Sequence, residues 1–216
     1  MRRVRWLSFG ITLAVLLPTM ASAQAGRSFR DSWIWGAKTG LMSFSTTTSK
    51  NVAAPMIGAE WLITRSRAAL YVSIDQAFFN ETVGLFDPTA GTDRTVQIGD
   101  MRRTSVALLA FPTRVRSVRP YGGIGLALNI IQDVSVRVAP GDSSDLRAFA
   151  RQVLDEKDRA AVLLMGGVQG RVGRVSVFGQ GTLMPARQRF LLNDRATFFL
   201  ETGVRWNFGS SVERPQ

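Results

Sequence analysis

The sequence predicts an all-β chain that closes into an eight-stranded antiparallel up-and-down transmembrane β-barrel. Three observations favour this fold. About eight segments alternate apolar with polar or small residues, and each is near the ~9–11 residues that cross a membrane at a tilt. Short and long connections between these segments alternate along the chain. Charged side chains largely avoid the apolar faces, which is typical of strands that face lipid.

The N-terminus has the pattern of a secretory signal peptide. Arg2, Arg3 and Arg5 precede an apolar run from Leu7 to Leu17, and a small-residue cleavage site follows at Ala21-Ser22-Ala23. The apolar run is too short for a spanning helix, so a membrane anchor is the weaker alternative. We therefore expect a cleaved segment at residues 1–23 and a single barrel domain at residues 24–216.

The composition excludes several classes of function. The chain has no cysteine and no histidine, so disulfides, Ser-His-Asp catalysis and histidine-based zinc sites are ruled out. Its formal charge is +11, of which three positive charges belong to the predicted signal peptide, leaving +8. The arginines are scattered, which favours anionic lipid or polysaccharide over nucleic acid as a partner. We expect no cofactor and no metal.

The first three strands are expected over Ser32–Ser45, Pro55–Thr64 and Ala68–Phe78. Each has one apolar face, formed in turn by Trp33, Trp35, Ala37 and Leu41, by Ile57, Ala59, Trp61 and Ile63, and by Leu70, Val72 and Ile74. Side chains alternate across a strand, so the polar and small residues lie opposite. A polar loop at Thr46–Val52 and a tight turn at Arg65–Arg67 connect these strands.

A long loop is predicted over Asn80–Thr95, because this stretch is rich in turn-forming residues. Strand four is expected over Val96–Phe111, with Val106 and Leu108 on its apolar face. Strand five is expected over Tyr121–Ile131, where four apolar residues alternate with glycine, alanine and asparagine.

The segment Val138–Arg159 is polar and contains a possible extracellular-loop helix. Its apolar residues recur at helical spacing and include Leu146, Phe149, Val153 and Leu154. This helix would cover the barrel mouth or lie on the membrane surface. The last three strands are expected over Ala161–Gln169, Arg174–Met184 and Arg195–Gly209.

The connections after strands two, four and six are shorter than the others. This alternation is typical of an outer-membrane barrel with periplasmic turns and longer extracellular loops. A soluble lipocalin-like barrel shares the meander, but it would need its apolar faces inside. In the outer-membrane barrel, the tryptophans Trp33, Trp35 and Trp206 would form part of an aromatic belt at the periplasmic interface.

Charged residues opposite the apolar faces predict pairs inside the lumen. These residues are Lys38, Glu60, Asp75, Glu201 and Arg205. Lys38 is expected to pair with Glu201, because the first and last strands are neighbours in a closed barrel. Arg205 is expected to pair with Glu60 or with Asp75. Arg102 shares the apolar face of strand four, so it is placed with Arg103 in the outer headgroup zone, where it could reach lipid phosphates.

The chain resembles the small outer-membrane β-barrel family of Gram-negative bacteria, which includes the OmpA-like transmembrane domain, OmpX-like and opacity-type proteins. The resemblance depends on residues 119–128 and on Gly203–Phe208. In the second segment Val204, Trp206 and Phe208 look like the aromatic signal read by the barrel-assembly machinery, although residues 209–216 follow it. The resemblance implies an outer-membrane location, contact with lipid and lipopolysaccharide, and a monomer.

Four functions remain open at this stage. The first is a non-enzymatic barrel with a structural or loop-mediated role and a lumen filled by side chains. The second is a lipid-modifying membrane enzyme, which the absence of histidine disfavours. The third is a binding module based on the loop helix, and the fourth is a soluble periplasmic barrel that carries a small lipid.

Overall fold

The computed structural model describes residues 31–46, 48–49, 51–87, 91–112, 118–136, 149, 151, 153–154, 158–185 and 196–210. The predicted signal peptide lies outside the described residues. Within the described part of the chain, no helix is both long and apolar enough to cross a membrane.

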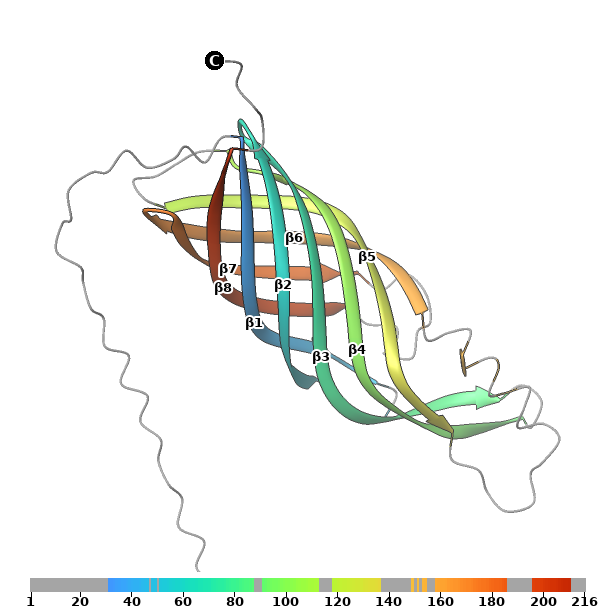
Figure 1. Ribbon diagram of the computed structural model, residues 1–216. Coiled ribbons are helices and arrows are strands. Elements are labelled where there is room, and N and C mark those ends of the chain that lie inside the picture. The colour runs from blue at the N-terminus through green and yellow to red at the C-terminus, as the bar shows by residue number, and fades with distance from the viewer. Residues whose placement is uncertain are drawn as a thin grey trace, which may run out of the picture.

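Eight antiparallel strands form one closed sheet in which each strand pairs with the next and β8 pairs with β1 (Figure 1). This arrangement confirms the predicted fold class. The strands are β1 (Ser32–Phe44), β2 (Val52–Arg65), β3 (Ala68–Asp87), β4 (Thr92–Ala110), β5 (Val118–Val136), β6 (Asp158–Val172), β7 (Val175–Met184) and β8 (Thr197–Ser210). All connections described join sequence neighbours, so the barrel is an up-and-down meander.

The apolar faces of the strands point away from the barrel interior. Ile124 and Leu126 on β5 are 57% and 64% exposed, and Leu200 on β8 is 59% exposed. The opposite faces point into the barrel and carry all of the charged residues that are buried in the described strands. A soluble barrel would have the reverse arrangement, so the lipocalin-like alternative does not fit this chain.

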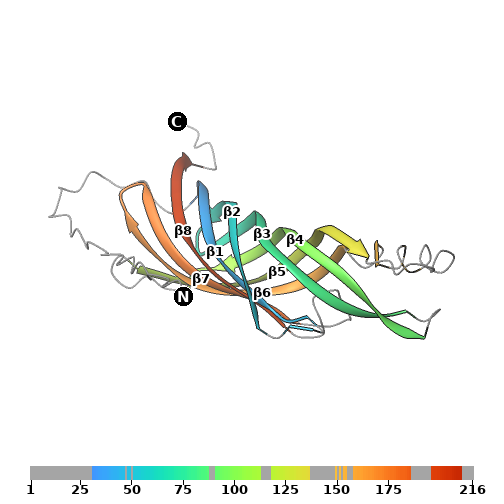
Figure 2. The same cartoon turned by 90° about the horizontal axis from the view of Figure 1, so that it is seen from below.

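The predicted loop over Asn80–Thr95 is wrong. β3 continues to Asp87 and β4 begins at Thr92, and the two remain paired as far as that point. This hairpin projects beyond the rest of the barrel together with the end of β5 (Figures 1 and 2). The turn-forming residues in this stretch therefore mark only a hairpin tip and a bulge, because tertiary pairing outweighs the local preference for a loop.

A β-bulge explains why the alternation changes on β4. Asp100 has a φ of 42°, and the pairing of β4 with β3 shifts there, whereas its pairing with β5 keeps one register. Met101 and Arg103 point inward on one side of the bulge, and Ile98 and Val96 point inward on the other. The bulge thus moves the inward face from odd to even residues, which a bulge does by adding one unpaired residue.

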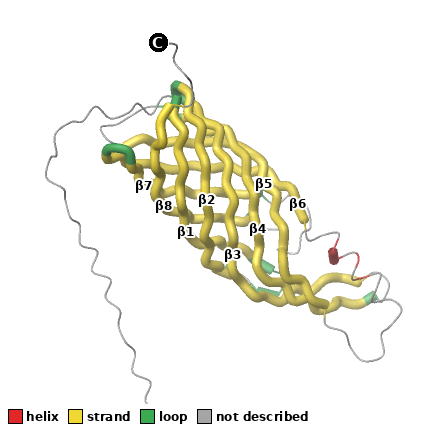
Figure 3. Tube along the Cα trace, viewed as in Figure 1, coloured by secondary structure: helices red, strands yellow, loops and turns green. Residues whose placement is uncertain are grey.

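The two ends of the barrel differ. At one end lie the two-residue turns Ser66–Arg67 and Gly173–Arg174, together with the start of β1 and the end of β8 (Figure 3). We call this the turn end. The opposite end carries the β3–β4 hairpin and the connections from β1 to β2 and from β5 to β6, and we call it the loop end.

The interior has three layers along the barrel axis. Buried apolar residues at the turn end include Ile34, Leu62, Leu109 and Phe111. Another apolar layer toward the loop end includes Met42, Met56, Met101, Ile131 and Phe199. Between them lies a polar layer, described next, that both apolar layers separate from water.

Candidate functional site

Six charged side chains are buried in the barrel interior, and each is at most 4% exposed. They are Lys38 on β1, Glu60 on β2, Asp75 on β3, Arg103 on β4, and Glu201 and Arg205 on β8. Among the described residues these are all the buried charged groups. Three are cations and three are anions, so their formal charges cancel. Buried charges persist only when they are paired in this way.

Four of these residues form the first cluster. Lys38 Nζ lies 3.0 Å from Glu201 Oε1 and 2.9 Å from Asp75 Oδ1. Arg103 Nη2 donates to the same two carboxylates, at 2.7 Å to Asp75 Oδ2 and 2.6 Å to Glu201 Oε1. Each anion therefore contacts both cations, and the cluster links β1, β3, β4 and β8.

Arg205 and Glu60 form the second cluster, nearer the turn end. Arg205 Nε donates to Glu60 Oε1, and Nη1 donates to Gln169 Oε1 at 2.7 Å. The guanidinium also lies 3.8 Å from the centroid of the Phe178 ring. An arginine between a carboxylate and an aromatic face gains both charge-assisted hydrogen bonds and cation–π attraction.

Gln180 on β7 connects the two clusters. Its Nε2 donates to Glu201 Oε2 at 2.7 Å. Its Oε1 accepts from Tyr121 Oη at 2.8 Å and from Arg205 Nη2 at 3.3 Å. With Tyr71, whose hydroxyl accepts from Lys38 Nζ at 2.7 Å, the network has a member on every strand. We call it the lumen network: Lys38, Glu60, Tyr71, Asp75, Arg103, Tyr121, Gln169, Gln180, Glu201 and Arg205.

Lumen-facing glycines make room for the carboxylates. A β-carbon at Gly58 would lie 2.1 Å from Asp75 Oδ1, which sits on the neighbouring strand. One at Gly36 would lie 2.9 Å from Glu60 Oε1. A narrow barrel leaves space only for side chains, so these glycines decide where the long polar groups can turn.

The structure brings together most, but not all, of the residues that the sequence singled out. Lys38 lies against Glu201, and Arg205 lies against Glu60. Of the two expected partners of Arg205, Glu60 is the one beside it, and Asp75 instead contacts Lys38 and Arg103. The reason is register, because Asp75 is the Cα partner of Arg103 on the adjacent strand.

Arg103 does not lie where the sequence predicts. It is 2% exposed and points into the lumen, not into the headgroup zone beside Arg102. Arg102 points outward, with its Nε 3.4 Å from Gln76 Oε1. The missed signal is simple: Arg103 shares its face with Ser105 and Ala107, the small-residue face of the strand.

The remaining predicted residues lie at the outer wall and at the loop end. Val204, Trp206 and Phe208 all point outward from β8. Phe149, Val153 and Leu154 are helical, with the first two buried and Leu154 half exposed. Leu146 lies outside the described residues.

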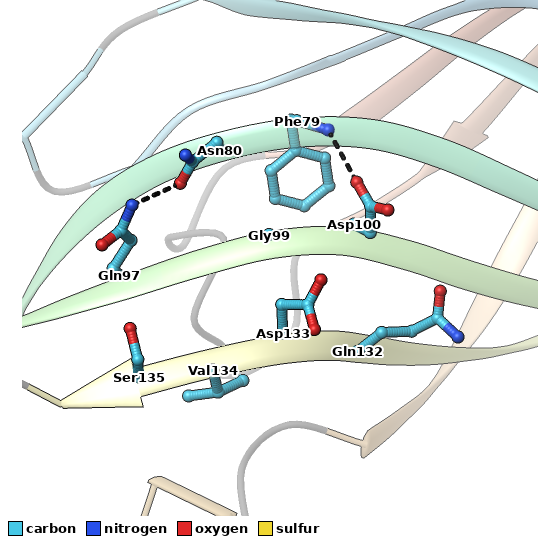
Figure 4. Close-up of a pocket in the computed structure, with 9 residues that line it drawn as sticks. All are labelled: Phe79, Asn80, Gln97, Gly99, Asp100, Gln132, Asp133, Val134 and Ser135. Carbon is cyan, nitrogen blue, oxygen red and sulfur yellow. Dashed lines mark hydrogen bonds between the residues drawn. The ribbon is translucent and has the colours of Figure 1, made fainter.

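A polar hollow of about 590 Å³ lies beside the β-bulge at the loop end (Figure 4). It is lined from β3, β4 and β5 by Phe79, Asn80, Gln97, Gly99, Asp100, Gln132, Asp133, Val134 and Ser135. Asp100 Oδ1 accepts a hydrogen bond from the Phe79 amide, which holds the bulge. Across the described residues, no three carboxylate groups are placed to hold a metal ion.

The closed sheet, the apolar outer wall and the neutralised polar interior define an outer-membrane-type transmembrane β-barrel. The fold is also found among solved structures. The chain is similar to Neisserial surface protein A (NspA), with a TM-score of 0.54 and 13% identity over 82% of this chain and 97% of that one. It also aligns with Ail, the attachment invasion locus protein of Yersinia pestis, with a TM-score of 0.48 and 10% identity over 83% of this chain and 99% of that one. No protein-family model and no curated sequence matches the chain.

Proposed function

We propose that this chain resides in a bacterial outer membrane as a non-enzymatic barrel, with a closed interior and a loop end that contacts other envelope or surface molecules. The observation that carries the proposal is the lumen network. It is a charge-neutral polar layer with a member on all eight strands, and it fills the lumen. The apolar wall around it is suited to contact with lipid.

The lumen network supports a structural role for the interior. Its ions contact each other directly, and apolar layers cover it toward both ends. An eight-stranded barrel has little interior space beyond its own side chains. We therefore expect no stable aqueous pore.

The same network argues against acid–base catalysis in the lumen. Glu60, Asp75 and Glu201 are each at most 3% exposed and each contacts a cation. A general acid or base must reach a substrate proton, and these carboxylates are enclosed. A lipid-modifying enzyme is thus the weaker proposal.

The loop end supports a role in interaction. The β3–β4 hairpin and the end of β5 extend the wall on one side of the barrel (Figure 1). The connection after β1 is held against this extension, because the hydroxyls of Thr46 and Thr48 donate to the Thr82 carbonyl. Arg102 faces outward on the barrel side of this extension, a position that suits contact with lipopolysaccharide phosphates. We expect a monomer delivered by the barrel-assembly machinery.

Membrane fractionation combined with planar-bilayer recording tests the proposal. The protein is expected in detergent-extracted outer membrane, with a heat-modifiable gel shift and no large stable conductance. A matched variant, Arg103→Ser with Glu201→Ser, removes one cation and one anion together and is expected to raise conductance. Recovery in the soluble periplasmic extract, or a large conductance of the unmodified protein, would contradict the proposal.

A further inference from the structure

Arginines gather at the turn end of the barrel. Arg65 ends β2 and Arg67 lies in the β2–β3 turn. Arg119 lies at the start of β5, Arg171 lies near the end of β6, and Arg174 lies in the β6–β7 turn. We call these five residues the arginine rim. Among the described residues at this end, Asp31 is the one acid outside the lumen network. The rim is therefore strongly positive.

The rim is held close to the barrel edge. Arg65, Arg67 and Arg174 are exposed, and their side chains make no hydrogen bond or ion pair within the described chain. Their turns are two residues long and are tied to adjacent strands. The Phe111 amide donates to the Arg67 carbonyl at 2.7 Å, and the Asn207 amide donates to the Arg174 carbonyl at 3.0 Å. These guanidinium groups can thus explore only a narrow zone.

A cluster of tryptophans marks that zone as the level of lipid headgroups. Trp33, Trp35, Trp61 and Trp206 lie on the outer wall near the turn end, and the Trp35 and Trp61 rings stack at 5.5 Å. Tryptophan prefers the membrane interface. Arg65 follows Trp61 by four residues, or about 13 Å along a strand. The arginine rim therefore lies just beyond the tryptophans, at the depth of headgroup phosphates.

We propose that the arginine rim binds the phosphates of anionic phospholipids, of the phosphatidylglycerol type, in the leaflet at the turn end. This rests on the proposed membrane location. Guanidinium groups bind phosphate through paired hydrogen bonds. A zwitterionic headgroup adds an ammonium group that a cationic rim repels, whereas an anionic headgroup has no such group. At the loop end, by contrast, Arg102 shares the outer wall with the uncharged Gln76 and Gln132, and acids such as Asp133 lie nearby.

The tryptophans supply a local probe for this binding. The chain has five, and Trp6 lies in the predicted signal peptide, so the four left after cleavage are all at the turn end. The experiment reconstitutes the mature protein in vesicles that contain brominated phosphatidylglycerol or brominated phosphatidylcholine. Quenching of tryptophan fluorescence against lipid mole fraction then gives the relative binding constant of each lipid.

We expect at least a fivefold preference for phosphatidylglycerol, reduced by salt. An arginine near an anionic membrane surface contributes up to about fivefold. The variant Arg65→Gln, Arg67→Gln, Arg174→Gln is expected to lose most of the preference. The control, Arg102→Gln with Arg151→Gln, removes two exposed cations from the loop end and is expected to keep it. A heat-modifiable gel shift verifies folding of each variant.

The outcomes separate the two proposals. Equal quenching by both lipids, or a preference that survives loss of the three arginines, overturns the arginine rim as a phospholipid site. Absence of quenching by either lipid instead contradicts membrane insertion and so the proposed function. If the triple variant does not fold, Arg67→Gln alone and the salt dependence of the unmodified protein decide the same question.

Discussion

At the scale of single residues, the chain depends on charges that have no access to water. Arg205 is completely buried, and its Nε donates to Glu60 Oε1. Such a pair contributes little net stability, because desolvation of both ions offsets their attraction. Removal of one partner is costly, since the other charge then stays buried and uncompensated.

Glu60→Gln is therefore expected to lower the free energy of unfolding by about 3–5 kcal/mol. The double variant Glu60→Leu, Arg205→Met, which replaces both ions with apolar groups, is expected to be closer to the unmodified protein than either single change. Urea unfolding from lipid vesicles, followed by tryptophan fluorescence, measures both. A double variant that is less stable than either single variant would contradict this account.

Residue type together with the alternation of each strand is enough to predict five of the six buried charges. Lys38, Glu60, Asp75, Glu201 and Arg205 all lie opposite apolar faces in the sequence. Arg103 was not found, because two arginines in a row give no indication of which one points inward. The face of Ser105 and Ala107 decides it, because both lie on the same side of the bulge at Asp100 as Arg103 and share its face. Network members such as Gln180 carry no sequence signal beyond their alternation.

At the scale of strands, glycine has two different uses. On the lumen side, a β-carbon at Gly40 would lie 2.1 Å from the Leu200 carbonyl oxygen, so the backbones approach too closely for any larger residue. On the outer wall, a β-carbon at Gly179 would meet nothing within 4 Å. The first glycine is required by the curvature of the sheet, and the second is not.

Gly40→Ala is expected to prevent stable folding or to destabilise the barrel by several kcal/mol, because backbone cannot move aside as a side chain can. Gly179→Ala is the matched control. It is expected to be neutral or to stabilise by about 0.4–1 kcal/mol, since alanine restricts the unfolded chain. Refolding yield and urea midpoint check both. Equal effects of the two changes would argue against the close approach of β1 and β8.

The extended hairpin is expected to be dispensable for closure of the barrel. The pairs Ala77↔Met101 and Asn80↔Gly99 bracket the bulge, and the lumen network lies entirely on the turn-end side of it. Replacing residues 80–99 with an Asn-Gly turn should retain a heat-modifiable barrel. Loss of the gel shift in this variant, with the shift intact in the unmodified protein, would show that the extension is needed for folding.

The sequence predicts which segments form strands, but it does not predict where β3 and β4 end. Alternation is set by burial on one face, so it marks each strand across the membrane-spanning region. Beyond that region both faces of β3 and β4 carry polar groups, and the stretch Asn80–Thr95 has the composition of a loop. Pairing between β3 and β4 holds it as a strand, and the few apolar residues that it buries, Val83, Val96 and Ile98, are too sparse to give a clear periodic signal.

At the scale of the whole molecule, the fold predicts which end faces the cell exterior. The loop end is expected outside and the turn end in the periplasm. Because the chain lacks cysteine, single substitutions give an unambiguous label. Ser135→Cys at the loop end should react with a membrane-impermeant maleimide on intact cells, and Arg67→Cys at the turn end should react only after lysis. Both positions are exposed. The reverse labelling pattern would invert the topology.

The strand that closes the barrel, β8, carries two of the six lumen ions. Glu201 pairs with cations on β1 and β4, and Arg205 pairs with a carboxylate on β2. Neither is neutralised by an ion of the β7–β8 hairpin. An incomplete sheet would present a bare carboxylate and a bare guanidinium to the bilayer, at a cost that lipid cannot offset. Insertion therefore selects for closed barrels, because a chain is stable in the membrane only after β1 and β8 have paired.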